Sequence, residues 1–211
     1  KEKLDFLRRI RDNLILVAPS YWLANLAKEK TDGDIRVEHI PYGVDTDLFA
    51  PKDKNLARKE IGLPPKKMWL GSASTWSNSR KGFDILAKAL KQIDCSDLGL
   101  LSWGEPPKDK LPSELTVKLL GNVSGTERLS ANYSACDVFI CPSRADNLPN
   151  TVLESLSCGV PVIGSDVGGI PDMIEEDFNG LIFKSNDPQS CSVKIIDAQM
   201  KIGSFHMLRI S

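Results

Sequence analysis

Two pairs of charged residues have types and spacing that could do chemistry: Asp146 and Glu154, eight positions apart, and the adjacent Arg80 and Lys81. A carboxylate such as that of Glu154 can accept hydrogen bonds from two vicinal hydroxyl groups at once. Two adjacent cations suit a diphosphate, because each can meet a negative charge with charge-assisted hydrogen bonds. The four residues therefore fit a ligand that carries a sugar diol and a diphosphate.

Each of these residues also has a simpler interpretation. Arg80 and Lys81 by themselves would be a solvated pair on a loop. Glu154 would interact with the dipole of a helix in its first turn, and Asp146 would form a turn before Asn147. The choice depends on whether the surrounding elements bring the four side chains to one place.

The segment around the two carboxylates predicts two successive strand-to-helix turns. The apolar run 138–141 predicts a buried parallel strand, and Asn150 predicts the N-cap of a helix over 151–157. A second strand is expected over 160–164, and Gly168-Gly169 opens the next turn. Both turns follow the carboxyl ends of strands, where open α/β sheets bind ligands and helix amides receive anions.

The chain after Lys66 continues this alternation of strands and helices. Six strands are expected there, and the alternation predicts an α/β fold with a Rossmann-like, doubly wound parallel sheet. Arg80 and Lys81 follow the first of these strands, at the same edge as the carboxylates. The predicted strands are 67–72, 98–103, 115–120, 137–141, 160–164 and 180–183, and the predicted helices are 82–93, 126–135, 151–157 and 188–201.

The first 45 residues predict a smaller unit. An amphipathic helix is expected over 1–12, a buried strand over 13–18 and a second strand over 35–40. Ser20 predicts the N-cap of a helix that ends at about Lys30. The side chains of this helix that are expected to face inward are Trp22, Leu23 and Leu26.

The sequence resembles glycosyltransferase family 4 and related retaining transferases of the GT-B fold. Members carry E-x7-E in the context P-S-x-x-E…E-A-x-A-x-G-x-P-V-V…G-G-x-P-E. The corresponding residues here are Pro142-Ser143, Asp146-x7-Glu154, Cys158-Gly159-Val160-Pro161-Val162 and Gly168-Gly169-Ile170-Pro171-Asp172. The opening is also similar to the end of the family's first domain, in Ala18-Pro-Ser-Tyr-Trp-Leu-Ala24 and Ile40-Pro-Tyr-Gly-Val-Asp45. The motif departs from the family at Asp146, which replaces a Glu and is one methylene shorter.

The resemblance implies a donor site. Asp146 would lie beside the donor sugar as the catalytic carboxylate, and Lys81 would contact the donor phosphates as the Lys of the family's K-G does. Arg80 is expected to stand in for the family's second phosphate-binding Arg, and Glu154 would hold the ribose hydroxyls. Gly121 would let the nucleobase approach the backbone. The predicted donor-binding residues are Arg80, Lys81, Glu154, Asn150, Thr151, Asn147, Gly121, Asn122, Gly168 and Gly169.

The resemblance also implies a reaction and partners. A hexose-type sugar would pass from a nucleoside diphosphate sugar to a hydroxyl acceptor, in glycan, lipid or polysaccharide synthesis, with no metal or other cofactor. Two alternatives remain on the same fold. One is a nucleotide-sugar epimerase, for which two histidines offer few acid–base groups; the other is a non-catalytic nucleotide-sugar-binding or interaction module. Trp76 is the tryptophan expected to be a stacking platform.

Composition argues against several other classes. The formal net charge of -1 gives no basic excess for nucleic acid. Five cysteines without C-x-x-C predict reduced, buried thiols, and two distant histidines argue against a Cys/His metal site. No apolar run reaches about 18 residues, and the first residues do not resemble a signal peptide. A cytoplasmic location is expected, with peripheral membrane association of the full enzyme left open.

Two domains are expected. Residues 1–45 would be a remnant of the family's acceptor-side domain with the linker, and 46–211 the nucleotide-sugar-binding domain. The resemblance implies a chain truncated at both ends, because most of the first domain and the family's terminal helix are missing. These residues alone are expected to bind donor without turnover. The apolar faces of 1–45 are expected to fold back on the rest or to drive self-association.

Overall fold

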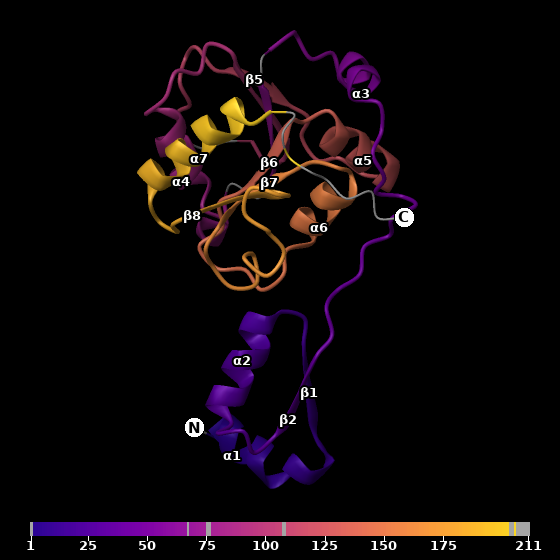
Figure 1. Cartoon of the computed structure of the whole chain (residues 1–211), viewed down its shortest axis with the longest axis vertical. Helices are drawn as coiled ribbons and strands as arrows, with labels where there is room; N and C mark the ends of the chain where they lie inside the picture. The colour runs from indigo at the N-terminus through magenta and orange to yellow at the C-terminus, as the bar shows by residue number, and fades with distance from the viewer. Residues whose placement is uncertain (1, 67, 75–76, 107–108, 203–204, 206–211) are drawn as a thin grey trace.

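The computed structural model describes residues 2–66, 68–74, 77–106, 109–202 and 205, and these residues form two separate parallel sheets (Figure 1). A two-stranded sheet lies in the N-terminal part, and a six-stranded sheet forms the larger body. The elements in chain order are α1 (Glu2–Arg9), a 3-10 turn (Arg11–Asn13), β1 (Ile15–Ala18), α2 (Tyr21–Lys30), β2 (Arg36–His39), α3 (Lys54–Ile61), β3 (Met68–Ser74), a second 3-10 turn (Ser79–Lys81), α4 (Phe83–Leu90), β4 (Leu98–Gly104), β5 (Thr116–Leu119), α5 (Thr126–Ser134), β6 (Val138–Cys141), α6 (Asn150–Ser157), β7 (Val162–Ser165), β8 (Gly180–Phe183) and α7 (Pro188–Met200).

The larger sheet has the topology that the sequence predicts. Its strands run in the order β5-β4-β3-β6-β7-β8, and every pairing is parallel. The chain leaves β3 toward one edge, returns, and leaves β6 toward the other edge. The direction therefore changes between β3 and β6, and ligands of open α/β sheets bind at the carboxyl ends of the strands at such a point. The prediction of six strands in a doubly wound sheet is confirmed.

Helices cover both faces of this sheet, with α4 and α7 on one side and α3, α5 and α6 on the other (Figure 1). Side chains alternate between the two faces along each strand. Leu70 and Leu100 therefore join the core under α4 and α7, whereas Trp69 and Leu101 join the core under the other three helices. Because both faces are covered, the central strands are continuous apolar runs; all four residues of β6 are buried.

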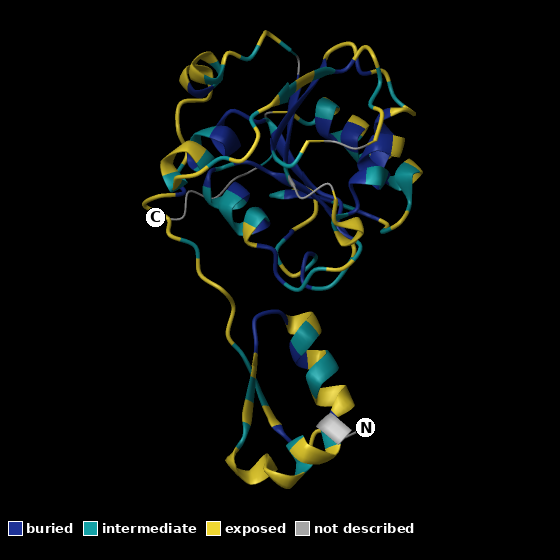
Figure 2. Cartoon of the chain, turned by 180° about the vertical axis from the view of Figure 1, so that it is seen from behind, coloured by how far each residue is buried: buried dark blue, intermediate teal, exposed yellow. Residues whose placement is uncertain are grey.

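The N-terminal part is more exposed than the sequence predicts (Figure 2). Strand β1 pairs in parallel with β2, but Ile15 is 51% exposed and Val17 is 57% exposed. The predicted strand is confirmed over Ile15–Ala18, but its predicted burial is wrong, because a sheet of two strands leaves one face uncovered within the described residues. Trp22, predicted to face inward, is 45% exposed, and α2 buries Ala24 instead.

Two helix boundaries also differ from the prediction. α1 ends at Arg9, and a 3-10 turn takes the place of its predicted last residues. Asn150 is the first residue of α6 rather than its N-cap. Pro149 occupies the N-cap position with an extended backbone, and its carbonyl accepts a hydrogen bond from the N–H of Val152 at 3.0 Å. A proline fits there because its nitrogen has no N–H that needs a partner.

All five cysteines are buried as unpaired thiols. Burial raises the pKa of Cys141 to about 11, with smaller effects from neighbouring groups. No helix among the described residues is long and apolar enough to cross a membrane. The domain boundary placed after Asp45 stays a prediction.

Candidate functional site

The loops that follow β3 and β6 meet at the switch point of the sheet. The first loop carries Arg80 and Lys81, and the second carries Asp146. Lys81 Nζ lies 2.6 Å from Asp146 Oδ2, which also accepts a hydrogen bond from Ser143 Oγ at 3.2 Å. Arg80 Nη1 lies 3.8 Å from Asp146 Oδ1. The structure thus brings both cations and the first carboxylate of the sequence motif together.

Backbone contact holds these two loops at a fixed separation. Gly82, directly after Lys81, has a φ of +68°, and a Cβ there would lie 1.9 Å from the carbonyl oxygen of Pro142. Glycine is required on both counts, because other residues rarely adopt this conformation and no side-chain atom fits in the gap. The position of Lys81 relative to Asp146 therefore depends on this contact.

Arg144 ties the same loops together through its side chain. Its Nη1 and Nη2 donate to Oδ1 and Oδ2 of Asp84 at 2.7 and 2.8 Å, a bidentate pair of the strong, geometrically specific kind. Nη1 also donates to the carbonyl of Ser79, and Nε donates to Asn186 Oδ1, both at 2.7 Å. The Arg144 N–H donates to the carbonyl of Arg80 at 2.7 Å. One side chain thus anchors the loop that carries the cations.

The Arg144–Asp84 pair predicts a pH dependence of stability. The hydrogen bond from Arg144, aided by Lys88, lowers the pKa of Asp84 from 3.8 to about 2 against the effect of burial. A pKa lowered by folding stabilises the fold above the unfolded pKa, and this stability is lost as the pH falls toward the folded pKa. We expect the free energy of unfolding to fall more steeply from pH 3.8 toward about 2 in wild type than in Asp84→Asn.

Urea unfolding at a series of pH values measures this difference. Asp12→Asn is the matched control, because the Asp12 side chain is 93% exposed. It should keep the wild-type steepness. An Asp84→Asn profile that is parallel to wild type would contradict the role given to the pair.

A pocket of about 310 Å³ lies beside the junction of the two loops. Its lining comes from the ends of three neighbouring strands and from the first turn of α6, so it lies at the carboxyl edge of the sheet. Lys81 forms part of its wall and thus links the pocket to Asp146. The lining residues are Ala73, Lys81, Trp103, Gly104, Asn122, Val123 and Thr151.

The second carboxylate of the motif, Glu154, is not among the residues that line this pocket. Glu154 Oε2 accepts a hydrogen bond from the hydroxyl of Tyr133 at 2.7 Å. Burial and the Glu154 charge raise the pKa of Tyr133 well above its ordinary value, so the hydroxyl stays a donor. The ring of Tyr133 packs edge-on against Trp103, with ring centroids 5.0 Å apart. Tyr133 therefore fixes one oxygen of Glu154 and one wall of the pocket.

Four further predicted residues lie around the same edge. Asn122 and Thr151 line the pocket. Gly121 has a φ of +64°, with open space where a side chain would stand, and its carbonyl accepts a hydrogen bond from the N–H of Gly104 at 2.7 Å. Asn150 is exposed at the start of α6. The structure therefore leaves space for a ligand group beside Gly121.

Gly168 and Gly169 contact the protein's own chain. A Cβ on Gly168 would lie 1.6 Å from the carbonyl oxygen of Asp146, and one on Gly169 would lie 2.0 Å from that of Asn147. The side chain of Asn147 accepts a hydrogen bond from Ser20. Packing against the Asp146–Asn147 loop is enough to require both glycines, and their contact with a ligand stays a prediction.

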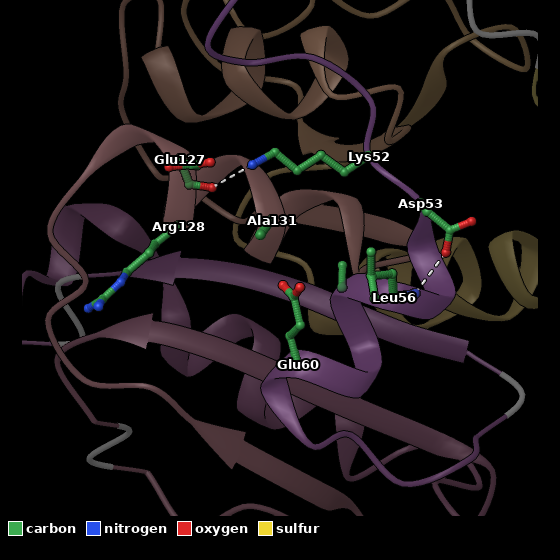
Figure 3. Close-up of a pocket in the computed structure, with 8 residues that line it drawn as sticks. Lys52, Asp53, Leu56, Glu60, Glu127, Arg128 and Ala131 are labelled. Carbon is green, nitrogen blue, oxygen red and sulfur yellow. Dashed lines mark hydrogen bonds between the residues drawn. The ribbon is translucent and has the colours of Figure 1, made fainter.

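A second pocket of about 310 Å³ lies between α3 and α5 (Figure 3). It shares no lining residue with the first, and Lys52 there donates to the carbonyl of Glu127 at 3.0 Å. Its walls mix both signs of charge with apolar groups, which favours no particular ligand chemistry. Its lining residues are Lys52, Asp53, Leu56, Ala57, Glu60, Glu127, Arg128 and Ala131.

Several residues of the site could not be recognised from the sequence. Trp103 had one signal, its place at the carboxyl end of a predicted strand. Tyr133 and the Arg144–Asp84 pair had none, because their partners lie far away in the sequence. Trp76 lies outside the described residues. Among the residues that are described, no group of three His, Cys, Asp or Glu side chains is placed to hold a metal ion.

The sheet order and the cluster at its switch point define the class of doubly wound α/β proteins with a ligand crevice at the carboxyl edge. Within that class, the chain belongs to the group 1 glycosyl transferases. The model of this family matches residues 65–199, more than half of the chain.

Curated relatives agree with this family. The chain is 28% identical over 173 residues to D-inositol 3-phosphate glycosyltransferase of Segniliparus rotundus, covering 76% of this chain and 38% of that protein. It is 29% identical over 161 residues to sulfoquinovosyl transferase SQD2 of Arabidopsis thaliana, covering 72% of this chain and 31% of that protein. The chain therefore spans about a third of the length of these relatives. Their names give no support to the epimerase or to a non-catalytic module.

Solved structures show the fold. Sucrose-phosphate synthase from Thermosynechococcus elongatus matches with a TM-score of 0.82 and 22% identity, covering 99% of this chain and 55% of that chain. The Anabaena protein Alr3699/HepE in complex with UDP matches with a TM-score of 0.77 and 17% identity, covering 98% of this chain and 60% of that chain. These matches confirm the predicted α/β sheet of the GT-B fold.

Proposed function

We propose that this protein is the donor-binding part of a retaining glycosyltransferase, which moves a sugar from a nucleoside diphosphate sugar to a hydroxyl acceptor. The observation that carries the proposal is the Lys81–Asp146 pair, 2.6 Å apart, at the rim of the pocket at the switch point. A cation and a carboxylate side by side can bind different parts of a nucleotide sugar. The cation binds the diphosphate, and the carboxylate accepts hydrogen bonds from the sugar hydroxyls.

The leaving diphosphate is neutralised by Lys81, by the more exposed Arg80 and by the amides of Asn150 and Thr151. The first amides of a helix have no partner within the helix and attract anions. Fixed donors that face developing negative charge stabilise a transition state. Asp146 then holds the sugar, and Glu154, oriented by Tyr133, holds the ribose diol.

UDP is the nucleotide to test first, because Alr3699/HepE has been solved with UDP and with UDP-glucose. In this proposal the two cations replace a metal ion at the diphosphate. The acceptor is a glycan, lipid or polysaccharide hydroxyl on the cytoplasmic side. The acceptor-side residues belong to a domain of which 1–45 is a part.

The test of this proposal is the loss of ribose recognition in Glu154→Ala. The variant should bind UDP more weakly by about 1.5–3 kcal/mol, the range for hydrogen bonds to a charged group. Calorimetry should show that wild type binds 2′,3′-dideoxy-UDP about as weakly as Glu154→Ala binds UDP, because both lack the same bonds.

Two controls make this result specific. Glu60→Ala removes an exposed helix glutamate of the other pocket and should bind UDP as wild type does. Tyr133→Phe should lie between wild type and Glu154→Ala, since it removes only the bond that orients the carboxylate. If wild type binds the dideoxy nucleotide as tightly as UDP, Glu154 has another role.

A polypeptide of these 211 residues should bind a nucleotide without turning over its sugar. Transfer depends on positioning and on exclusion of water. In this proposal the acceptor side falls to residues 1–45, whose described residues form a small two-stranded unit. Incubation with UDP-, GDP- and ADP-sugars should release no nucleotide above the no-protein control. Sustained release that depends on an acceptor would show that this chain holds both sides of the reaction.

A further inference from the structure

The start of α2 is attached to the loop that carries Asp146. Ser20, the N-cap of α2, is fully buried. Its Oγ accepts a hydrogen bond from the N–H of Leu23 at 3.0 Å and donates to Asn147 Oδ1 at 2.6 Å. The cap bond fixes the position of the oxygen, so its single O–H is committed to Asn147.

A second hydrogen bond holds the same turn of α2. The N–H of Trp22 donates to Asp172 Oδ2 at 3.2 Å. Asp172 belongs to the segment that begins with Gly168 and Gly169, whereas Asn147 belongs to the loop after β6. The first turn of α2 is therefore bonded to both loops on this side of the sheet.

Steric contact adds to these bonds. A Cβ on Gly169 would lie 2.5 Å from Ser20 Cβ and 2.0 Å from the carbonyl oxygen of Asn147. A Cβ on Gly168 would lie 1.6 Å from the carbonyl oxygen of Asp146. Three segments far apart in the sequence are thus packed without room for another side chain. A shift of α2 must move the main chain at Asp146 or break the contact.

We propose that Ser20 is a positioning residue for the candidate site: through Asn147 it sets the main chain of Asp146, and so the carboxylate that faces Lys81. The N-terminal part and the Asp146 loop then move together. A change in the position of α2 reaches the Lys81–Asp146 pair although Ser20 touches neither residue's charged group. The effect on ligand binding rests on the proposed function, whereas the effect on the loop does not.

The first measurement is hydrogen exchange of the backbone amides of 143–148 in the ligand-free protein. Ser20→Ala and Asn147→Ala should each speed exchange there about fivefold, the effect of one hydrogen bond. Asp53→Ala is the matched control, because Asp53 caps α3 through the N–H of Leu56 at 2.7 Å and lines the other pocket. It should leave exchange of 143–148 unchanged.

The second measurement is the affinity for UDP in a double-mutant cycle. Ser20→Ala and Asn147→Ala should each weaken binding about fivefold, and the double variant should be no weaker than either alone.

The outcomes separate this inference from the proposed function. Unchanged exchange of 143–148 in both alanine variants would overturn the inference, and so would equal acceleration by Asp53→Ala. Additive losses of UDP affinity would overturn it as well. If wild type binds neither UDP, GDP nor ADP, the proposed function fails, and the exchange measurement alone decides the role of Ser20. If Ser20→Ala does not fold, the exchange rates of Asn147→Ala decide it.

Discussion

The double variant Arg80→Ala/Lys81→Ala is expected to bind UDP at least about a hundredfold more weakly than wild type and to bind uridine equally well. Each charged hydrogen bond to the diphosphate contributes about 1.5–3 kcal/mol. The loss is enlarged because the Asp146 carboxylate, whose side chain is only 11% exposed, then lies beside the phosphates without its cationic partners. Calorimetry with UDP and uridine at low and high salt measures both affinities, and in wild type added salt should erode the preference for UDP.

The control for total charge is Lys194→Ala/Lys201→Ala. It also removes two cations, which pair with Glu176 and Asp177 away from the switch point. This variant should keep the wild-type preference for UDP over uridine. Equal binding of UDP and uridine by wild type would refute the assignment of Arg80 and Lys81 to the diphosphate.

Gly82→Ala is expected to destabilise the fold by about 3 kcal/mol and to abolish measurable UDP binding. A left-handed backbone costs a non-glycine residue about 1–2 kcal/mol, and overpacking costs about 1–3 kcal/mol more. The overpacking arises because the new Cβ would lie 1.9 Å from the carbonyl oxygen of Pro142. Relief of this contact must separate Lys81 from Asp146. Denaturant unfolding and calorimetry measure the two effects.

Gly62→Ala is the control that separates the cost of a left-handed backbone from the cost of a steric contact. Gly62 has a φ of +72°, and the nearest atom to an added Cβ is the flexible end of Lys118 at 3.9 Å. It should cost about 1 kcal/mol and leave UDP binding intact. If both variants lose the same stability, the contact between Gly82 and Pro142 does not hold the two loops together.

The sequence could predict the large sheet because its strands are covered on both faces. A strand such as β6 is then a continuous apolar run between turn residues, and this pattern can be read without knowing its partners. The carboxyl edge followed from the alternation of strands and helices. The sequence could place Lys81 and Asp146 at this same edge, because each follows a predicted strand. That these two strands are neighbours, which brings the residues together, is shown by the structure.

The remaining features depend on contacts that no local pattern encodes. The apolar residues of β1 predict a buried strand, yet Ile15 and Val17 are exposed. Burial of a strand requires another element that packs on each face, and the residues of the strand do not encode it. Asn150 has the residue type of an N-cap, yet Pro149 takes that position. The bidentate bond between Arg144 and Asp84 joins the loop after β6 to the first turn of α4. Secondary-structure propensity and hydrophobic periodicity reflect residues close in the sequence, whereas these features arise from contacts between residues far apart in it.

The reactivity of the five buried cysteines can report local unfolding of the protein. A thiol reacts as its thiolate, and burial raises the pKa of Cys141 and Cys158 to about 11 and that of Cys191 to about 12. These thiols are also buried, so each is expected to react slowly with alkylating reagents until its own surroundings open. Cys141 ends β6, Cys158 follows α6 and Cys191 lies in α7. The order in which they are alkylated would show, without an engineered label, whether the sheet or the helices on one of its faces open first.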